Sequence, residues 1–149
     1  MAEQQFINEV PSNLEDLKKK SNNKSSWRDR LDAVNELKRY DCRQSRDIIK
    51  ILALHDPVYK VMEAAFGAAQ AFGITKKRKP LYLGKKKKGN LVEGITKILV
   101  RVRNSFEGEF CVQDFKEKFK GIDPRTYDTY EGEMGDGFDE WLENVLLTL

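Results

Sequence analysis

The amino-acid sequence predicts an all-α protein, formed by a short antiparallel stack of helices and a small helical C-terminal unit. Apolar residues recur every three or four positions through most of the chain, which is the period of an amphipathic helix. Residues 58–69 also repeat the pattern of residues 27–38 at an offset of 31 positions. A self-match at this period is typical of stacked helical repeats. Because such repeats are usually binding surfaces, the sequence favours a binding protein over an enzyme.

Charge divides the 149 residues into two regions. Residues 1–89 hold 20 Lys or Arg and 11 Asp or Glu, whereas residues 90–149 hold 7 and 13. A basic part followed by an acidic part indicates two functional regions. We therefore expect a helical-repeat region at 1–75, a basic linker at 76–89 and an acidic helical unit at 90–149.

Several absences narrow the class of protein. The sequence has no run of about 18 apolar residues that would cross a membrane. Its first residues lack the basic and apolar regions of a signal peptide. Cys42 and Cys111 are far apart and form no CxxC pattern, so we expect reduced, structural thiols. Together these features predict a cytoplasmic protein that does not enter a membrane.

The first predicted helix is short. Ser12 and Glu15 have the spacing of a capping box, with Ser12 as the N-cap of a helix over residues 14–20. A polar loop follows, in which Ser25 or Ser26 is well placed to cap the next helix. That helix, residues 27–40, carries one apolar stripe: Trp27, Leu31, Val34, Leu37 and Tyr40.

Two further helices complete the first region. Residues 43–54 form one of them, and its expected buried residues are Ile48, Ile49, Ile51, Leu52 and Leu54. Asp56-Pro57 ends this helix, because proline suits the first turn of a new helix and disfavours continuation of the old one. Residues 58–72 are rich in alanine and glycine, which allow helices to approach closely. Gly73 is a suitable C-cap.

This stretch resembles HEAT repeats, the antiparallel helix pairs that stack into ARM-type α-solenoids. The likeness covers about residues 25–73. It rests on the linker Asp56-Pro57-Val58-Tyr59, the helix core Glu63-Ala64-Ala65 and Gly73, with Trp27-Arg28, Ala33-Val34 and Leu37 repeating the pattern less closely. Tyr59 occupies a position that is usually arginine in the family. The resemblance implies a scaffold that binds protein or nucleic acid and has no inherent catalysis.

The acidic region begins with a predicted helix over residues 90–106. Its shared apolar face consists of Leu91, Ile95, Ile98, Leu99, Val102 and Phe106. Phe110-Cys111 is expected to form a very short strand. Residues 112–120 then place Phe115 and Phe119 four positions apart, as in a compact amphipathic helix.

The end of the chain is expected to contain one turn, one loop and one helix. Pro124 opens the turn, which carries Tyr127 and Tyr130. Residues 132–137 form a glycine-containing loop, and residues 138–149 form the closing helix. The order of elements is compatible with a helix-turn-helix or winged-helix-like unit. The segment that would read DNA carries Asp123, Asp128 and Glu131 against Arg125, and these carboxylates would repel phosphate.

Catalysis and cofactor binding have little support in the sequence. The single histidine, His55, ends a predicted helix and has no recognisable nucleophile or orienting partner. Two isolated cysteines and one histidine do not make a zinc site. The glycines and lysines of residues 84–90 do not follow the order of a phosphate-binding P-loop. We therefore expect no enzymatic activity, no metal site and no cofactor.

Nucleic-acid binding has more support. Arg43, Arg46 and Lys50 line one face of the second repeat helix, Arg39 extends this stripe, and the HEAT resemblance implies that this helix lies on the concave side. Lysine runs in the linker add cations, and Tyr82 lies between them where it can stack on a base. The predicted contact residues are Arg39, Arg43, Arg46, Lys50, Lys76, Lys77, Arg78, Lys79, Tyr82, Lys85, Lys86, Lys87 and Lys88. The partner can be DNA or RNA, and binding should weaken with salt.

Two other interpretations remain open. In the first, the charged helix face is simply solvated and the lysine runs keep the linker extended. In the second, the protein is an adaptor for another protein and does not bind nucleic acid. An adaptor would use the helical-repeat face or the acidic unit, whose aromatic residues Tyr127, Tyr130, Phe138 and Trp141 are either interface anchors or core.

Overall fold

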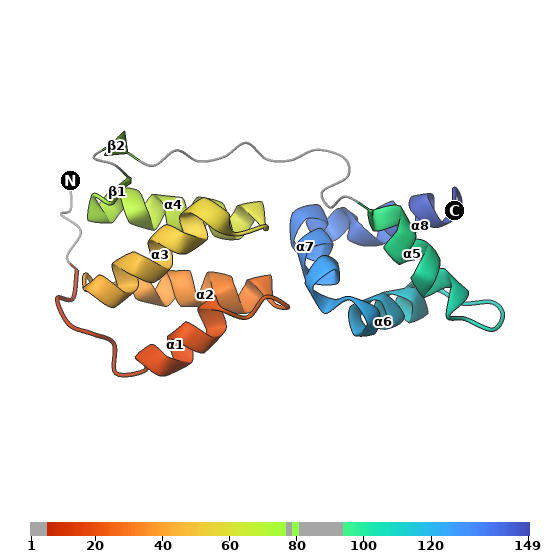
Figure 1. The fold of residues 1–149 in the computed structure, drawn as a ribbon, viewed down its shortest axis with the longest axis horizontal. Coiled ribbons are helices and arrows are strands. Elements are labelled where there is room, and N and C mark those ends of the chain that lie inside the picture. Colours follow the sequence, from red (N-terminus) through yellow and green to blue (C-terminus); the bar gives the residue numbers. More distant parts are fainter. Residues whose placement is uncertain (1–5, 77–78, 81–93) are drawn as a thin grey trace. The chain divides into compact units, whose positions relative to one another are not determined.

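The computed structural model describes residues 6–76, 79–80 and 94–149, and the predicted all-α class is confirmed (Figure 1). The chain divides into two compact units, Met1–Lys85 and Lys86–Leu149. Besides helices, the described residues include an antiparallel pair of two-residue strands, β1 (Thr75–Lys76) and β2 (Lys79–Pro80). No helix in the described part of the chain is long and apolar enough to span a membrane.

The described residues of the first unit form four helices: α1 (Leu14–Ser21), α2 (Trp27–Leu37), α3 (Arg43–His55) and α4 (Tyr59–Phe72). Helix α4 packs most extensively against α3 and also contacts α2, and α1 packs against α2. The core between them is aliphatic and rich in alanine, and Phe72 is the one buried aromatic residue that the structure describes there.

Local capping explains where these helices begin and end. Ser26 is the N-cap of α2 and its hydroxyl accepts the Asp29 N–H at 3.2 Å. Gly73 ends α4 with φ +73°, a conformation that favours glycine. The capping box predicted at Ser12 is wrong: Asn13 is the N-cap of α1 and makes no side-chain cap. Ser12 instead lies inside a turn in which Leu14 N–H donates to the Pro11 carbonyl at 3.1 Å.

A buried ion pair joins α2 to the turn between α3 and α4. Arg30 Nε donates to Asp56 Oδ2 at 2.7 Å and Arg30 Nη2 to Asp56 Oδ1 at 3.3 Å, with side-chain exposures of 0% and 1%. Arg30 Nη1 also donates to the Asn23 carbonyl at 2.7 Å, and Asp56 Oδ1 accepts the Val58 N–H at 2.9 Å. These bonds satisfy both buried charges and fix two loops to one helix.

Residues Phe6 and Ile7, which we name the N-terminal clasp, hold the start of the described chain against the first unit. Ile7 N–H donates to the Arg39 carbonyl and Asp41 N–H donates to the Ile7 carbonyl, both at 2.8 Å. The ring of Phe6 lies 4.8 Å from that of Phe72. The clasp therefore reaches across the end of α2 to the end of α4.

Burial of the α3 isoleucines differs from the prediction at one position. Ile49 and Leu52 are buried and Ile48 and Leu54 are partly buried, but Ile51 is 56% exposed. A helix turns by about 100° per residue, so Ile51 shares its face with Asp47 and His55, which are four positions away and exposed. Ile51 therefore points away from α4.

The second unit contains α5 (Ile95–Asn104), α6 (Val112–Ile122), α7 (Pro124–Met134), the 3-10 turn Gly135–Gly137 and α8 (Phe138–Leu146). Aromatic rings form a chain of contacts through its core. Phe119 contacts Phe115 and Tyr127 edge-on, with centroids 6.3 Å and 5.4 Å apart. Tyr130 stacks on Trp141 at 5.0 Å. The second unit is thus built around ring contacts.

Several predicted boundaries in this unit are wrong. Helix α5 begins at Ile95, because Gly94 is its N-cap with φ +82°; residues 90–93 of the predicted helix lie outside the described residues. Phe110-Cys111 is not a strand: Cys111 is the N-cap of α6, and its N–H donates to Asp114 Oδ2 at 3.4 Å.

The predicted turn after Pro124 is a full helix, and the predicted loop at residues 132–137 is largely absent. Asp123 caps this helix, accepting the Thr126 N–H at 3.1 Å, and Pro124 occupies the first turn. Gly132 is buried within α7 and leaves only residues 135–137 as the 3-10 turn. Tertiary packing therefore overrides the weak helix propensity of glycine. Tyr130 and Phe138 are buried and Tyr127 and Trp141 partly so, which makes these aromatic residues core.

Candidate nucleic-acid interface

The predicted basic stripe on α3 does not present a uniform row of available cations. Arg43 is 91% exposed and lies 3.8 Å from Asp47. Arg46 is held by Asp41, with Nε to Oδ1 at 2.6 Å and Nη2 to Oδ2 at 3.3 Å, and its guanidinium lies 5.5 Å from the Phe72 ring centroid. Lys50 is half-buried. Arg46 is therefore engaged in the fold.

The Asp41–Arg46 contact changes the acidity of both groups. The hydrogen bond from Arg46 lowers the pKa of Asp41, and the hydrogen bond to Asp41 raises the pKa of Arg46. Both changes favour the charged pair. This contact fixes the start of α3 and leaves Arg46 less available to a phosphate.

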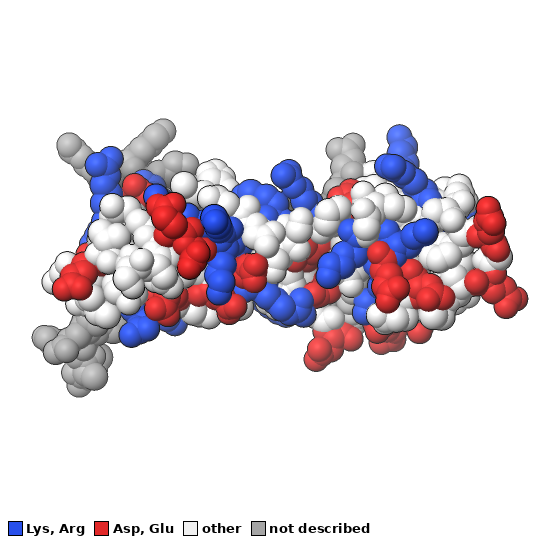
Figure 2. Space-filling view, turned by 90° about the horizontal axis from the view of Figure 1, so that it is seen from below, with Lys and Arg blue, Asp and Glu red and all other residues white. Residues whose placement is uncertain are grey.

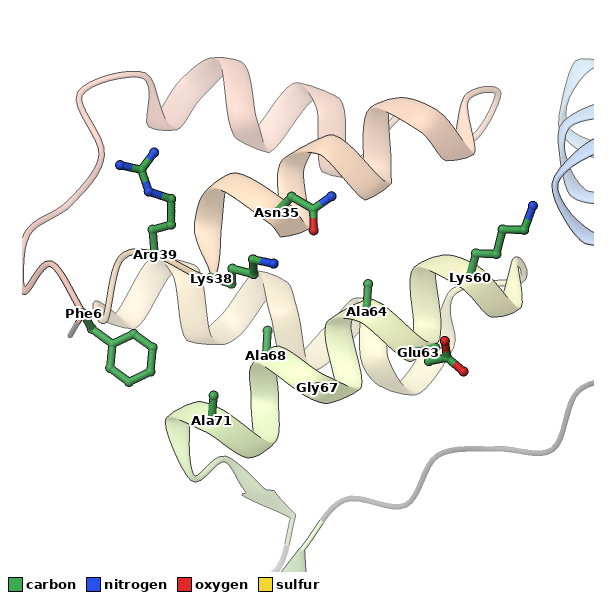
Figure 3. A pocket seen from close by; sticks show the side chains of 10 residues that line it. All are labelled: Phe6, Asn35, Lys38, Arg39, Lys60, Glu63, Ala64, Gly67, Ala68 and Ala71. Atoms are coloured by element: carbon green, nitrogen blue, oxygen red, sulfur yellow. The ribbon is translucent and has the colours of Figure 1, made fainter. Parts of the chain in front are cut away.

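Arg39 lies apart from the α3 residues. It follows Lys38, the C-cap of α2, and its Nη1 donates to Glu36 Oε1 at 3.3 Å. Its side chain lines a different surface, the groove between α2 and α4 (Figure 3). The structure thus separates Arg39 from Arg43, Arg46 and Lys50.

Most linker residues of the predicted site fall outside the described part of the chain. These are Lys77, Arg78, Tyr82, Lys85, Lys86, Lys87 and Lys88. Lys76 and Lys79 are paired in β1 and β2, and their side chains also lie outside the description. Their contribution to binding stays a prediction.

We define the α2–α4 groove by the ten residues that line it: Phe6, Asn35, Lys38, Arg39, Lys60, Glu63, Ala64, Gly67, Ala68 and Ala71. Its volume is about 490 Å³. Figure 3 shows Phe6, Lys38 and Arg39 toward one end and Lys60 and Glu63 toward the other. Lys60 and Ala71 are eleven helical positions apart, which corresponds to about 16 Å along α4.

Small side chains make the groove shallow and open along α4. Ala64, Ala68 and Ala71 recur on one face of the helix, and Figure 3 shows them projecting toward the groove. Gly67 has open space around it: a Cβ added there would meet nothing within 4 Å. The α4 face is therefore open between the longer side chains that line the two ends of the groove.

Charge in the groove is mostly positive. The lining contains three cations, Lys38, Arg39 and Lys60, and one carboxylate, Glu63. Arg39 also forms an ion pair with Glu36 at 3.3 Å. Lys38 and Lys60 form no ion pair with any residue the structure describes. Lys60 Nζ and the Arg28 guanidinium lie 5.0 Å and 4.5 Å from the Trp27 ring centroid. This geometry adds a cation–π cluster beside the Lys60 end of the groove.

On the face drawn in Figure 2, neither unit shows charges of a single sign among its described residues. Figure 2 shows basic and acidic side chains interspersed over each unit on the face in view. Residues 6–75 hold 12 Lys or Arg and 10 Asp or Glu, so most of the positive excess of the first region lies in residues 76–88. The positive charge of the first region is therefore concentrated in the lysine runs, and the groove is a local feature of the folded surface.

The second unit uses its α6 lysines to cover aromatic rings. Lys116 Nζ lies 2.8 Å from Asp139 Oδ1 and 5.8 Å from the Phe138 ring centroid. The hydrogen bond to Asp139 raises the pKa of Lys116. Lys118 and Lys120 lie about 6 Å from the rings of Phe106 and Tyr127. All three lysines therefore lie near aromatic rings of the same unit.

Groups of catalytic or metal-binding type are scattered. His55 is exposed as the last residue of α3, Cys42 Sγ donates to Ser45 Oγ at 3.3 Å, and Cys111 is exposed. Within the described residues, no cluster of three or more His, Cys, Asp or Glu side chains is arranged to hold a metal ion.

Comparison with known proteins adds no relative: no family model, no curated protein and no solved structure matches this chain. The groove itself was missed by sequence reasoning, which placed the contact face on α3. Its signal was the spacing of Ala64, Ala68 and Ala71, which was interpreted as helix packing alone. Lys38 lies just after α2, so it belongs to no helical periodicity that would have linked it to the groove.

Proposed function

We propose that the protein is a non-catalytic binding protein that holds nucleic-acid phosphates along the α2–α4 groove, on a HEAT-like scaffold. The supporting observation is the groove itself, which is lined by Lys38, Arg39 and Lys60 together with alanines and a glycine, and by one carboxylate, Glu63. Lysine and arginine neutralise phosphates and release counterions, so such a site contributes affinity without reading sequence.

The sequence next to the groove favours a polyanion over a short acidic peptide. Ala71 is followed five positions later by Lys76, the first of eight cations in residues 76–88, which contain no carboxylate. A nucleic-acid strand has continuous charge and can satisfy the groove and these lysines together. A peptide with isolated carboxylates would leave most of them unmatched. The groove, about 16 Å long, spans several phosphates of a strand with one charge per about 3.4 Å of axis.

The test is a fluorescence-anisotropy titration of the full chain with single- and double-stranded DNA and RNA at several salt concentrations. We expect binding at low salt that weakens steeply as salt rises. The variant Lys38→Glu/Lys60→Glu should bind more weakly. The slope of log affinity against log salt should fall by about 1.4 for a single strand or about 1.8 for a duplex.

Arg43→Glu is the matched control, because Arg43 is a 91% exposed cation that lies on α3 and does not line the groove. It should change affinity little. Equal losses in Arg43→Glu and the groove variant would show non-specific charge attraction. If only neutralisation of the lysines at 76–79 and 85–88 abolishes binding, the linker acts alone and the groove assignment is wrong. Absence of binding at low salt would refute nucleic-acid binding altogether.

A further inference from the structure

A second concave site lies on another side of the first unit, between the end of α1 and the middle of α3. We name it the Ile51 pocket, after the residue that the sequence predicted to be buried. It is lined by Lys18, Ser21, Asn22, Lys24, Ile48, Ile51 and Leu52, and its volume is about 200 Å³. Leu52 forms buried wall, Ile48 is partly buried, and Ile51 is 56% exposed at the mouth.

The pocket has the size and lining for one apolar side chain. An apolar cavity of about 150 Å³ accommodates benzene, so 200 Å³ admits one leucine, isoleucine or methionine side chain. Burial of such a side chain against Ile48, Ile51 and Leu52 removes apolar surface on both partners from water. Apolar anchors in pockets of this kind contribute much of the affinity of protein interfaces.

The rim of the pocket favours a negatively charged ligand. Lys18 and Lys24 line it, and no carboxylate does. Lys24 makes no ion pair with the residues that the structure describes, and Lys18 lies 3.5 Å from the 82% exposed Glu15. An exposed pair of that kind is weak and easily exchanged for another carboxylate. The last turn of α1 holds three lysines, which outweigh the partial negative charge of the helix end.

We propose that the Ile51 pocket is a docking site for an acidic segment of a partner protein, with one aliphatic side chain in the pocket and flanking carboxylates on Lys18 and Lys24. Charge complementarity selects the acidic flanks, and the apolar wall selects the aliphatic anchor. A nucleic-acid backbone presents phosphates but no aliphatic group for the pocket. A lipid surface is best met by a protruding apolar helix face, whereas this site is concave. The assignment is independent of nucleic-acid binding in the groove.

The test follows the amide resonances of the full-length ¹⁵N-labelled protein during titration with the peptide acetyl-Asp-Glu-Leu-Asp-Glu-amide. We expect saturable shifts confined to residues 18–24 and 48–52. Replacement of the peptide's leucine by serine should abolish them, as should a peptide with lysine in place of every acidic residue. The variants Ile51→Ser and Lys24→Glu, both at exposed positions, should each weaken binding at least about fivefold with the rest of the spectrum unchanged.

Lys19→Glu is the matched control, because Lys19 is an exposed lysine of the same helix turn but does not line the pocket. It should bind the peptide nearly as well as the natural chain. The proposal is overturned if no shifts occur at millimolar peptide, or if the serine peptide gives the same shifts. It is also overturned if anionic vesicles perturb these residues and the peptide does not. Shifts that depend on protein concentration without peptide would assign the pocket to a second copy of the chain instead.

Discussion

Of the thirteen buried hydrophobic residues in the core of the first unit one is aromatic, whereas four of the eight in the second unit are. Alanines bury little apolar area each, but they allow α4 to lie close to α2 and α3. The first unit fixes its loops with the buried Arg30–Asp56 pair, while the second unit relies on ring contacts between helices. Helices of similar length are therefore packed in two different ways in this chain. The first unit should be most sensitive to loss of its buried ion pair, and the second unit to loss of its ring contacts.

The largest expected effect tests the polar pair. Asp56→Ala leaves the Arg30 guanidinium buried without its carboxylate and removes the acceptor of the Val58 N–H. We expect the first unit to lose about 3–5 kcal/mol of unfolding free energy, and the second unit to lose none. Amide hydrogen exchange measures the two units separately within the full chain.

The double variant Arg30→Met/Asp56→Asn is the control for this substitution. It removes both charges and keeps an oxygen that can accept the Val58 N–H, so it should be much less destabilised than Asp56→Ala. If the double variant is as unstable as Asp56→Ala, the pair stabilises the first unit by more than the neutralisation of two buried charges. If Asp56→Ala affects both units, the independence of the two cores is wrong.

The next effect tests the ring contacts of the second unit. Phe119→Leu keeps much of the buried volume but removes the edge-on contacts with Phe115 and Tyr127. At about 0.5–1.5 kcal/mol for each aromatic pair, the second unit should lose about 1–3 kcal/mol. Leu142→Met, a volume-conserving change of a buried residue outside these ring pairs, should cost less. Equal losses in a denaturant titration would show that burial, and not ring geometry, stabilises this core.

Acid should weaken the first unit through Asp41. Its pKa is lowered by Arg46, so the pair stabilises the fold fully above the unfolded pKa of about 3.9. That stabilisation is lost as pH falls through the still lower folded value. The contribution is below about 1 kcal/mol because the pair is partly exposed. Comparing the pH dependence of unfolding in Asp41→Asn with that of the natural chain should show a loss restricted to this acidic range.

Alkali should weaken the second unit through Lys116, with a similarly small effect. The pKa of Lys116 is raised by Asp139, so the stabilisation is present below the unfolded pKa of about 10.4. It is lost as pH rises through the higher folded value. Lys116→Met should remove this alkaline loss and leave the acidic loss of the first unit unchanged. A common pH profile for both units would contradict their separate response.

Helix periodicity predicted most of the first unit, because α2, α3 and α4 each bury one regular face. It could not predict the exposure of Ile51, since α3 carries more isoleucine and leucine than its contact with α4 covers. The Arg30–Asp56 pair was also missed. A signal existed, because Arg30 shares the helix face of Trp27 and Val34, and an arginine on a buried face needs a carboxylate partner. The sequence alone does not identify which carboxylate.

The second unit was harder to predict. Gly132 and the three residues after Met134 suggested a loop, but buried contacts extend α7 through Gly132. Of the predicted site, Arg39 was expected to extend the α3 stripe, but it follows the end of α2 and lines the α2–α4 groove. Arg46 was predicted to contact nucleic acid, but it donates a hydrogen bond to Asp41, five positions away. Such local pairing is not distinguishable from a cationic stripe when charge spacing is the only information.

The N-terminal clasp lies at one end of the α2–α4 groove. Two backbone hydrogen bonds and the Phe6–Phe72 contact hold it in place, so its local opening costs less free energy than unfolding of the helices. With the clasp closed, Phe6 lines one end of the groove, and a strand bound there as we propose would leave it beside Lys60. With the clasp open, the same strand would be able to extend past both ends of the groove. Ligand length, independently of ligand sequence, would then select between the two states.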